Sequence, residues 1–447
     1  YQSKAHAYCE VIFGYGQTFR AGTIGTLADK TAFGYIKNYY EERGIHKRNC
    51  EIDRIVQGCV GVRRTTGQHP GGIVVLPVGE EINTFTPVQH PANDMTTATV
   101  TTHFDYHSID HNLLKLDILG HLDPTMIRML QDLTGIDPLE IPLDSKEVMS
   151  LFQNTSALGI KPEDIGGTKL GALGIPEFGT DFAMQMLMDT KPQYFSDLVR
   201  IAGLAHGTDV WLGNAQTLIK EGKATISTAI CTRDDIMIYL IQKGLDSEES
   251  FKIMEMVRKG KVASGKCKEW PEWKQDMIDH GVPDWYIWSC ERIKYMFPKA
   301  HAAAYVMMAW RVAYCKVFYP LAYYTAYFSI RATAFDYEKM AMSPVRLEHY
   351  IAEYKAKKAE GTISNTEEDE LGVMRIVQEM HARGYEFTPI DIYKAKARTF
   401  QIIDGKIMPS FKVISKVGEV AGESIEIAAR DGEFLSKDDL RQRAKIG

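Results

Sequence analysis

The fold class depends most on Leu113-Leu-Lys-Leu-Asp-Ile-Leu119, an apolar run that Gly120 ends. Such a run is typical of a buried β-strand. On a strand, Lys115 and Asp117 point to the same face, so a cation and a carboxylate leave an otherwise apolar element together. Burying both without a partner or a ligand is costly. The stretch predicts either a salt bridge within a sheet or a metal-binding carboxylate beside a phosphate-binding lysine.

Earlier residues predict the rest of this sheet. Gly72-Ile-Val-Val-Leu-Pro77 is a run of β-branched residues, and Thr97 to His107 alternates threonine, valine, aromatic and charged side chains. Residues 1–68 have a helical pattern, with Gly22-Thr-Ile-Gly-Thr26 as a turn. Strands with helices around them predict an α+β core.

A glycine-rich stretch, Thr65-Thr-Gly-Gln-His-Pro-Gly-Gly72, leads into the second of these strands. Glycines let a backbone approach a phosphate closely, and His69 lies among them. A plain tight turn explains the same residues equally well.

From Pro124 to about Ala334 the pattern is mostly helical. Residues 335–375 are polar and charged, and 359–369 is expected to be an exposed loop or linker. Residues 380–410 contain short strand-like runs. The final stretch predicts helices separated by turns, the first of them starting at Ile414.

One helix in the second half has an unusual distribution of polar groups. Phe297-Pro-Lys-Ala-His-Ala-Ala-Ala-Tyr-Val-Met-Met-Ala-Trp-Arg311 predicts a helix that begins near the proline. His301 and Tyr305 are four residues apart and share one face, next to the small residues Ala300 and Ala304. A flat, charged nucleotide fits such a face. A core helix whose alanines admit a neighbouring helix is the alternative.

Three other groups of residues are chemically suggestive. Ala205 to Asn214 is dense in side chains that recognise bases, and Arg258-Lys-Gly-Lys261 is a basic cluster. His103, Asp105 and His107 alternate along a predicted strand and would suit the metal site of a metallohydrolase. A polar sheet face explains the last set too.

The composition excludes several classes of protein. The chain has 447 residues, 45% hydrophobic and 25% charged, as in an ordinary globular protein. Its seven cysteines form no C-x-x-C pair, which argues against a zinc site or disulfide framework and favours a cytoplasmic protein. No apolar run is long enough to span a membrane. The net charge of −6 is only weak evidence against nucleic acid, because binding needs a local basic stripe.

Taken together, these motifs resemble the α subunit of bacterial DNA polymerase III, a C-family polymerase, in its PolC type. The resemblance covers essentially the whole chain. The motifs that carry it are, in chain order, Ala21-Gly-Thr-Ile-Gly-Thr-Leu-Ala-Asp-Lys-Thr31, Thr66-Gly-Gln-His-Pro-Gly-Gly-Ile-Val-Val75, Leu114-Lys-Leu-Asp-Ile-Leu-Gly-His121, Gly174-Ile-Pro-Glu-Phe-Gly179, His206-Gly-Thr-Asp-Val-Trp-Leu-Gly-Asn-Ala-Gln216, Val257-Arg-Lys-Gly-Lys261 and the Phe297–Arg311 helix.

The resemblance implies an α+β fold with a polymerase-β-like nucleotidyltransferase palm, incomplete here, mostly helical thumb and fingers, and a C-terminal helix–hairpin–helix that binds duplex DNA. The implied domains are a palm segment and thumb in residues 1–68, palm in 69–123, fingers in 124–334, a linker and duplex-binding region in 335–410, and a truncated helix–hairpin–helix in 411–447.

The implied reaction is attack of a primer 3′-hydroxyl on a dNTP, directed by template DNA in chromosomal replication, with two Mg²⁺ ions at the reacting oxygens. Asp117 matches the third of three metal-binding aspartates. The other two are expected upstream of Tyr1, so this chain alone is expected to show no primer extension. The implied partners are primer–template DNA, dNTPs, the sliding clamp and other replisome subunits.

The resemblance also assigns residues to the two ligands. The implied nucleotide-binding residues are Lys115, His206, Lys299, His301 and Tyr305. The implied contacts to DNA or phosphate are His69, Arg258, Lys259, Lys261, Lys416 and Gly418, although Lys416-Val-Gly418 stands where the family has Gly-x-Gly. Two alternatives stay open at this point. One is a non-catalytic nucleic-acid-binding protein on the same scaffold, and the other is the metallohydrolase.

Overall fold

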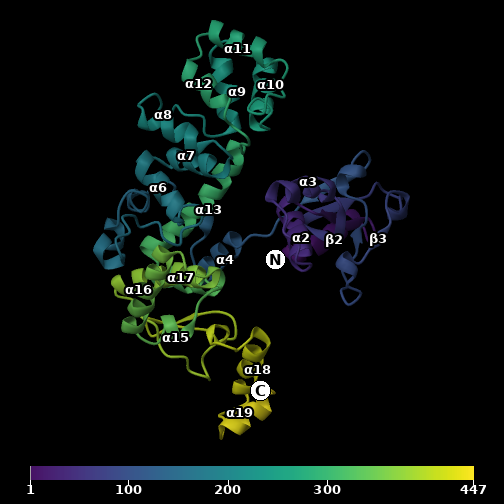
Figure 1. Cartoon of the computed structure of the whole chain (residues 1–447). Helices are drawn as coiled ribbons and strands as arrows, with labels where there is room; N and C mark the ends of the chain where they lie inside the picture. The colour runs from purple at the N-terminus through teal and green to yellow at the C-terminus, as the bar shows by residue number, and fades with distance from the viewer. Residues whose placement is uncertain (1) are drawn as a thin grey trace. The chain divides into compact units, whose positions relative to one another are not determined.

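The structure is a computed structural model that describes residues 2–447. The chain forms two compact units, one that extends to His121 and one from Leu122 to Gly447 (Figure 1). The first contains a five-stranded sheet and the second is mostly helical, so the predicted α+β class is confirmed. Among the helices of residues 2–447, none has the length and apolar character that a membrane span requires.

The first unit is built around a sheet with the strand order β3-β4-β1-β2-β5. β2 pairs antiparallel with both β1 and β5, and β4 runs parallel to β1. Short 3₁₀ turns connect the later strands. The elements are α1 (Gln2–Phe13), β1 (Thr18–Thr26), α2 (Asp29–Glu41), α3 (Asn49–Cys59), β2 (Arg63–Val75), β3 (Val88–Gln89), β4 (Thr101–Thr102) and β5 (Leu114–Asp117).

Two local predictions in this unit are wrong. Gly22 to Thr26 belongs to strand β1 and is not a turn. A Cβ at Gly22 would lie 1.8 Å from the carbonyl oxygen of Thr102, so glycine is needed here for close approach of β4. The strand predicted over 97–107 is limited to Thr101–Thr102, because the Asp105 side chain accepts from His107 N and starts a 3₁₀ turn.

The glycine-rich stretch at 65–72 is also not a tight turn, since it forms part of strand β2. Arg20 pairs with Ile73 and Gly22 pairs with Gln68, so residues 69–72 lie opposite Ala21 alone. This is an enlarged β-bulge, a feature that turns a side chain out of the regular pleat. The side chain it redirects is His69.

The second unit has one large hydrophobic core that extends from α4 to the region of β7. The 20-residue helix α13 is central, and it packs against α4, α5, α7, α9 and α14. The helices are α4 (Asp123–Thr134), α5 (Lys146–Ser150), α6 (Asp181–Thr190), α7 (Phe195–His206), α8 (Gln216–Lys220), α9 (Arg233–Gln242), α10 (Ser247–Arg258), α11 (Trp270–Asp279), α12 (Asp284–Cys290), α13 (Lys299–Phe318), α14 (Pro320–Ala326), α15 (Tyr337–Met340), α16 (Pro344–Glu360) and α17 (Asn365–Ala382).

The exposed loop predicted at 359–369 is much shorter in the structure. Helix α16 continues to Glu360, and α17 begins at Asn365 with a capping box between Ser364 and Glu367. The charged residues that suggested a loop lie on the outer sides of these helices. The apolar side of α17, including Met374 and Val377, is buried in the core.

Helix α17 also joins α13 through a buried ion pair. Lys316 Nζ on α13 lies 2.9 Å from Glu379 Oε1 on α17, and both side chains are 0% exposed. Burial lowers the pKa of Lys316 to about 8, against the opposing effect of the Glu379 charge. Tyr324 donates to the same carboxylate at 2.7 Å.

The C-terminal region forms a smaller core around Phe411 and Ile425, with the hairpin β6 (Gln401–Ile403) and β7 (Lys406–Met408) before it. The helix predicted from Ile414 is absent, and a 3₁₀ turn at Phe411–Val413 takes its place. Lys416 has φ +67°, a left-handed conformation that does not continue a helix. Two helices follow, α18 (Glu419–Arg430) and α19 (Lys437–Ala444).

A carboxyl pair between α10 and α11 gives a testable pH dependence. Glu249 hydrogen-bonds to Asp276, and burial, that bond and nearby carboxylates raise the pKa of Glu249 to about 7. The folded chain therefore holds a proton that the unfolded chain loses near pH 4.5, and stability falls as pH rises from about 4.5 to about 7. We expect Glu249→Gln to raise Tm at pH 8 and to have little effect at pH 4.5.

Tryptophan fluorescence during heating measures this effect, since all six tryptophans lie in the second unit. Glu248→Gln is the matched control, because Glu248 precedes Glu249 in α10 and pairs with the exposed Lys252. An equal change in Tm at both pH values would contradict the prediction.

Candidate functional site

Three predicted residues come together at the bulge of the first unit. Lys115 and Asp117 lie on β5, and pairing of β5 with β2 places them beside His69. Lys115 Nζ lies 3.4 Å from Asp117 Oδ2 and 3.3 Å from His69 Nε2, and His69 Nδ1 lies 3.7 Å from Asp117 Oδ1. The salt bridge predicted within the sheet is therefore present, with an imidazole added to it.

The bulge determines how His69 presents its ring. Its Nδ1 accepts from the backbone N–H groups of Gly71 at 3.1 Å and Gly72 at 2.7 Å. This pattern assigns the ring proton to Nε2. The Nε2–H group and the ammonium of Lys115 are then two donors side by side, which suits an anionic oxygen. Asp117, with its side chain 53% exposed, leaves a carboxylate at the edge of the same cluster.

This cluster has a limited capacity for metal. Mg²⁺ is commonly bound by one or two carboxylates together with substrate phosphates and water. Asp117 fits the role of one such ligand. Within residues 2–447, no group of three histidine, cysteine, aspartate or glutamate side chains is arranged to hold a metal ion.

The alternative metal site on the Thr97–His107 stretch is not formed. His103 Nδ1 contacts Gln89 Oε1 at 2.7 Å, and Asp105 is used to cap the turn that contains His107. Because the strand ends at Thr102, the three side chains do not alternate along one face. The structure thus removes the observation on which the metallohydrolase interpretation depended.

A second cluster lies in the second unit and is aromatic. His206 ends α7, Phe297 precedes α13, and His301 and Tyr305 lie on the first turns of α13. Ring centroids are 4.5 Å apart for His301 and Tyr305, 5.1 Å for Phe297 and His301, and 5.7 Å for His206 and His301. We call these four residues the aromatic cluster.

The small residues beside this cluster face solvent. Ala300 and Ala304 are exposed, whereas Ala302 and Val306 are buried against the core. The exposed alanines therefore do not admit a neighbouring helix, which was the alternative explanation for the stripe. Lys299 begins α13 and is exposed, with its backbone N–H donating to Asp234 at 2.6 Å.

Backbone contacts bring the basic segment 258–261 to the start of the same helix. Met296 N donates to the carbonyl of Arg258 at 3.2 Å, and Thr208 N donates to Tyr295 O at 2.9 Å. Gly260 permits this approach, because a Cβ there would lie 2.5 Å from the carbonyl oxygen of Lys294. The stretches 205–214, 258–261 and 297–311, which the sequence analysis treated separately, thus meet at the start of α13.

The charges of the basic segment are partly paired. Arg258 and Lys259 contact Glu255 at 2.5 and 2.9 Å, and the hydrogen bond from Arg258 is the main cause that lowers the Glu255 pKa to about 2. Lys261 is exposed. Burial, followed by the nearby His206, lowers the pKa of His301, which favours the neutral form of this ring.

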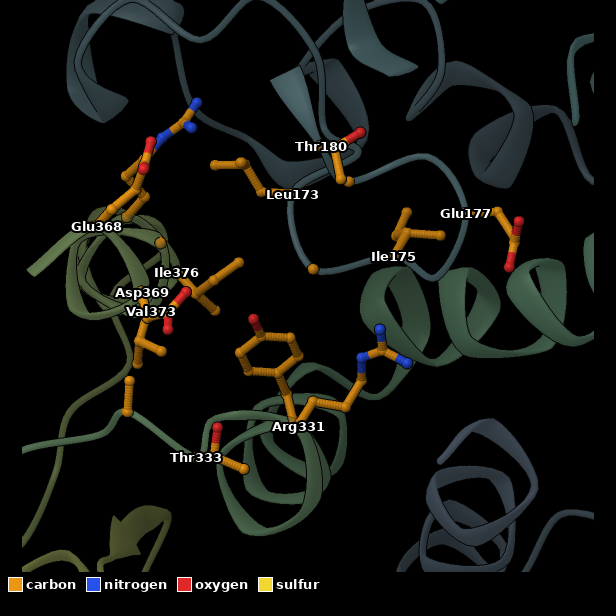
Figure 2. A pocket seen from close by; sticks show the side chains of 16 residues that line it. Leu173, Ile175, Glu177, Thr180, Arg331, Thr333, Glu368, Asp369, Val373 and Ile376 are labelled. Carbon is orange, nitrogen blue, oxygen red and sulfur yellow. The ribbon is translucent and has the colours of Figure 1, made fainter. Parts of the chain in front are cut away.

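The sequence prediction missed Glu177. Its Oε2 atom lies 2.5 Å from Nε2 of His206. The residue was visible within Gly174-Ile-Pro-Glu-Phe-Gly179, but nothing in the sequence linked that motif to His206. This loop borders a pocket of about 420 Å³, and Figure 2 shows Glu177 on the side of the loop away from α17 residues Glu368 and Ile376.

Lys416 and Gly418 lie apart from both clusters in sequence, at the C-terminal core. Gly418 is the N-cap of α18, and its carbonyl accepts from Gly422 N at 2.9 Å. Lys416 adopts the left-handed conformation that the first glycine of a Gly-x-Gly turn favours.

Comparisons with known proteins agree over the whole chain. Residues 1–120 match the family described as "Bacterial DNA polymerase III alpha NTPase domain", and residues 123–281 match "Bacterial DNA polymerase III alpha subunit finger domain". Among similar proteins, the DNA polymerase III PolC-type of Bacillus subtilis is 53% identical over 446 residues, that of Staphylococcus saprophyticus is 52% identical and that of Caldanaerobacter subterraneus is 51% identical. Each alignment covers 100% of this chain. The chain spans 30 to 31% of the length of these relatives.

Proposed function

We propose that this chain, which belongs to the bacterial DNA polymerase III α-subunit family and to its PolC type, takes part in template-directed DNA synthesis. The reaction adds a dNTP to the 3′-hydroxyl of a primer during chromosomal replication. The observation that carries the proposal is the meeting of the aromatic cluster with the basic segment 258–261 at the start of α13.

In this proposal the aromatic cluster receives the incoming nucleotide. Tyr305 offers an aromatic face to its base or sugar, and a neutral His301 can donate or accept a hydrogen bond there. The exposed ammonium of Lys299 neutralises phosphate oxygens. The exposed alanines of α13 leave room for a flat ligand against the helix.

The cluster of His69, Lys115 and Asp117 at the bulge has a complementary task in the first unit, which is the proposed palm. Lys115 and the Nε2–H group of His69 donate to a phosphate oxygen, and Asp117 supplies one carboxylate for a divalent cation. Bound Mg²⁺ would stabilise charge on the oxygens that react. The palm is proposed to have the polymerase-β-like nucleotidyltransferase form.

The remaining basic residues are proposed to contact DNA. Arg258, Lys259 and Lys261 neutralise backbone phosphates, and each such contact makes binding more sensitive to salt. The turn from Lys416 to Gly418 presents backbone N–H groups to a phosphate at the start of α18. The sliding clamp and other replisome subunits are proposed partners of the whole polymerase.

Replacing Tyr305 by Ala tests the proposed nucleotide site. In a full-length PolC-type polymerase that contains this chain, we expect KM for dNTPs to rise about tenfold, because stacking of one base on an aromatic side chain contributes about 1–3 kcal/mol. Steady-state primer extension at a series of dNTP concentrations measures this change.

Tyr194→Ala is the matched control, since that tyrosine is 72% exposed and lies outside the aromatic cluster. The control should leave KM unchanged. An unchanged KM for Tyr305→Ala in a folded enzyme would count against placing the nucleotide at this helix.

A further inference from the structure

Glu177 lies beside the aromatic cluster but comes from a different part of the chain, the loop at 173–180. We propose that Glu177 is a positioning residue, which holds the imidazole of His206 in the orientation that meets the incoming nucleotide. This inference rests on the function proposed above and adds a residue to its site.

The contact between the two side chains determines which ring nitrogen is available. Glu177 Oε2 lies 2.5 Å from Nε2 of His206, which is shielded from solvent and makes no hydrogen bond, so the two side chains are joined by close charge contact alone. The side chains of Glu177 and His206 are only 17% and 26% exposed. Among the hydrogen bonds of residues 2–447, none involves Nδ1 of His206. The carboxylate thus occupies one side of the ring and leaves Nδ1 for a ligand.

The loop that carries Glu177 is fixed to the helix that carries the cluster. Lys316 Nζ on α13 donates to the carbonyls of Gly171 at 2.8 Å and Leu173 at 2.6 Å. Tyr323 OH donates to the Leu173 carbonyl at 3.1 Å, and a Cβ at Gly174 would lie 2.2 Å from that hydroxyl. The loop and the cluster therefore share one rigid support, as positioning of a side chain requires.

The backbone of Glu177 supports a functional role over a purely structural one. Its φ is +70°, in the left-handed region that favours glycine. A non-glycine residue there carries strain, and such strain is common where a side chain is needed for function. Glycine at position 177 would relieve the strain and remove the carboxylate. If Glu177 positions His206, this change should weaken nucleotide binding without lowering Tm; if Glu177 only supports the fold, it should lower Tm.

The test uses the 447-residue chain with dGTP and Mg²⁺ as the probe, titrated by calorimetry. We expect Glu177→Gln to weaken dGTP binding about tenfold, because the amide keeps the shape of the side chain but loses the charge that attracts the His206 ring at close range. Glu177→Gly should weaken binding as much while Tm stays the same or rises. His206→Ala should weaken binding too, and adding Glu177→Gln to it should cause no further loss.

A second readout follows the ring itself. In protein with ¹⁵N-labelled histidine, the imidazole ¹⁵N shifts of His206, assigned by their loss in His206→Ala, should move in Glu177→Gln. Glu368→Gln is the matched control, since Glu368 lines the other side of the pocket and pairs with the exposed Lys358 (Figure 2). It should change neither the shifts nor dGTP binding.

The outcomes separate this inference from the function on which it rests. If His206→Ala weakens dGTP binding and Glu177→Gln does not, Glu177 has no positioning role and the proposed function stands. If Glu177→Gly loses both binding and Tm, Glu177 only supports the fold, and the inference is overturned. If His206→Ala leaves binding unchanged, the proposed nucleotide site itself is wrong.

Discussion

A full-length PolC-type polymerase that contains this chain should lose primer extension by a factor of about 10³ or more when Asp117 is replaced by Asn. The carboxylate is proposed to bind a divalent cation that stabilises charge developing in phosphoryl transfer, a contribution of several kcal/mol. Asparagine keeps the shape of the side chain but removes its charge. The measurement is kcat for primer extension at saturating dNTP and Mg²⁺.

The fold should tolerate this change, because the Asp117 side chain is 53% exposed and its ion pair with Lys115 is at the surface of the sheet. Asp110→Asn is a suitable control, since Asp110 lies in the same unit and its only ion pair among residues 2–447 is a 3.9 Å contact with His111. Full activity of Asp117→Asn, in the presence of an unchanged melting curve, would show that this carboxylate is not a metal ligand.

The Asp117 region also shows what the sequence could predict. Alternation along Leu113–Leu119 identified a strand with Lys115 and Asp117 on one face, and β5 has that form. The prediction that this strand is buried is wrong, because β5 lies at the edge of the sheet and leaves Leu114 and Leu119 exposed. The position of His69 was not predictable in the same way. It depends on a bulge opposite Ala21. A bulge arises when two paired strands differ in the number of residues between their matched positions, so the sequence of one strand does not predict it.

The second unit shows the same contrast. The sequence predicted the helix with His301 and Tyr305, because proline, alanine and a four-residue spacing are local signals. The contact between Glu177 and His206 joins residues 29 positions apart in the chain through a loop, and no local pattern indicates such a pair. The charged stretch near α16 and α17 was misread because charged residues on the outer face of a helix resemble those of a loop.

The largest expected effect on stability concerns Glu379. Replacing it by Ala should lower the free energy of unfolding of the second unit by about 3–5 kcal/mol, because Lys316 would remain buried without its partner. The hydrogen bond from Tyr324 would be lost as well. Urea unfolding followed by tryptophan fluorescence measures this, since all six tryptophans lie after His121.

Two further variants show whether the lost partner is the cause. Glu368→Ala is the control on the same helix, and its half-exposed pair with Lys358 should contribute no more than about 1 kcal/mol. The double variant Lys316→Met with Glu379→Met should recover part of the stability lost in Glu379→Ala, because it removes the uncompensated charge, although the Gly171 carbonyl and the Tyr324 hydroxyl lose their partners. If the double variant is as unstable as Glu379→Ala, the loss comes from packing around α17, and the uncompensated charge of Lys316 is not its source.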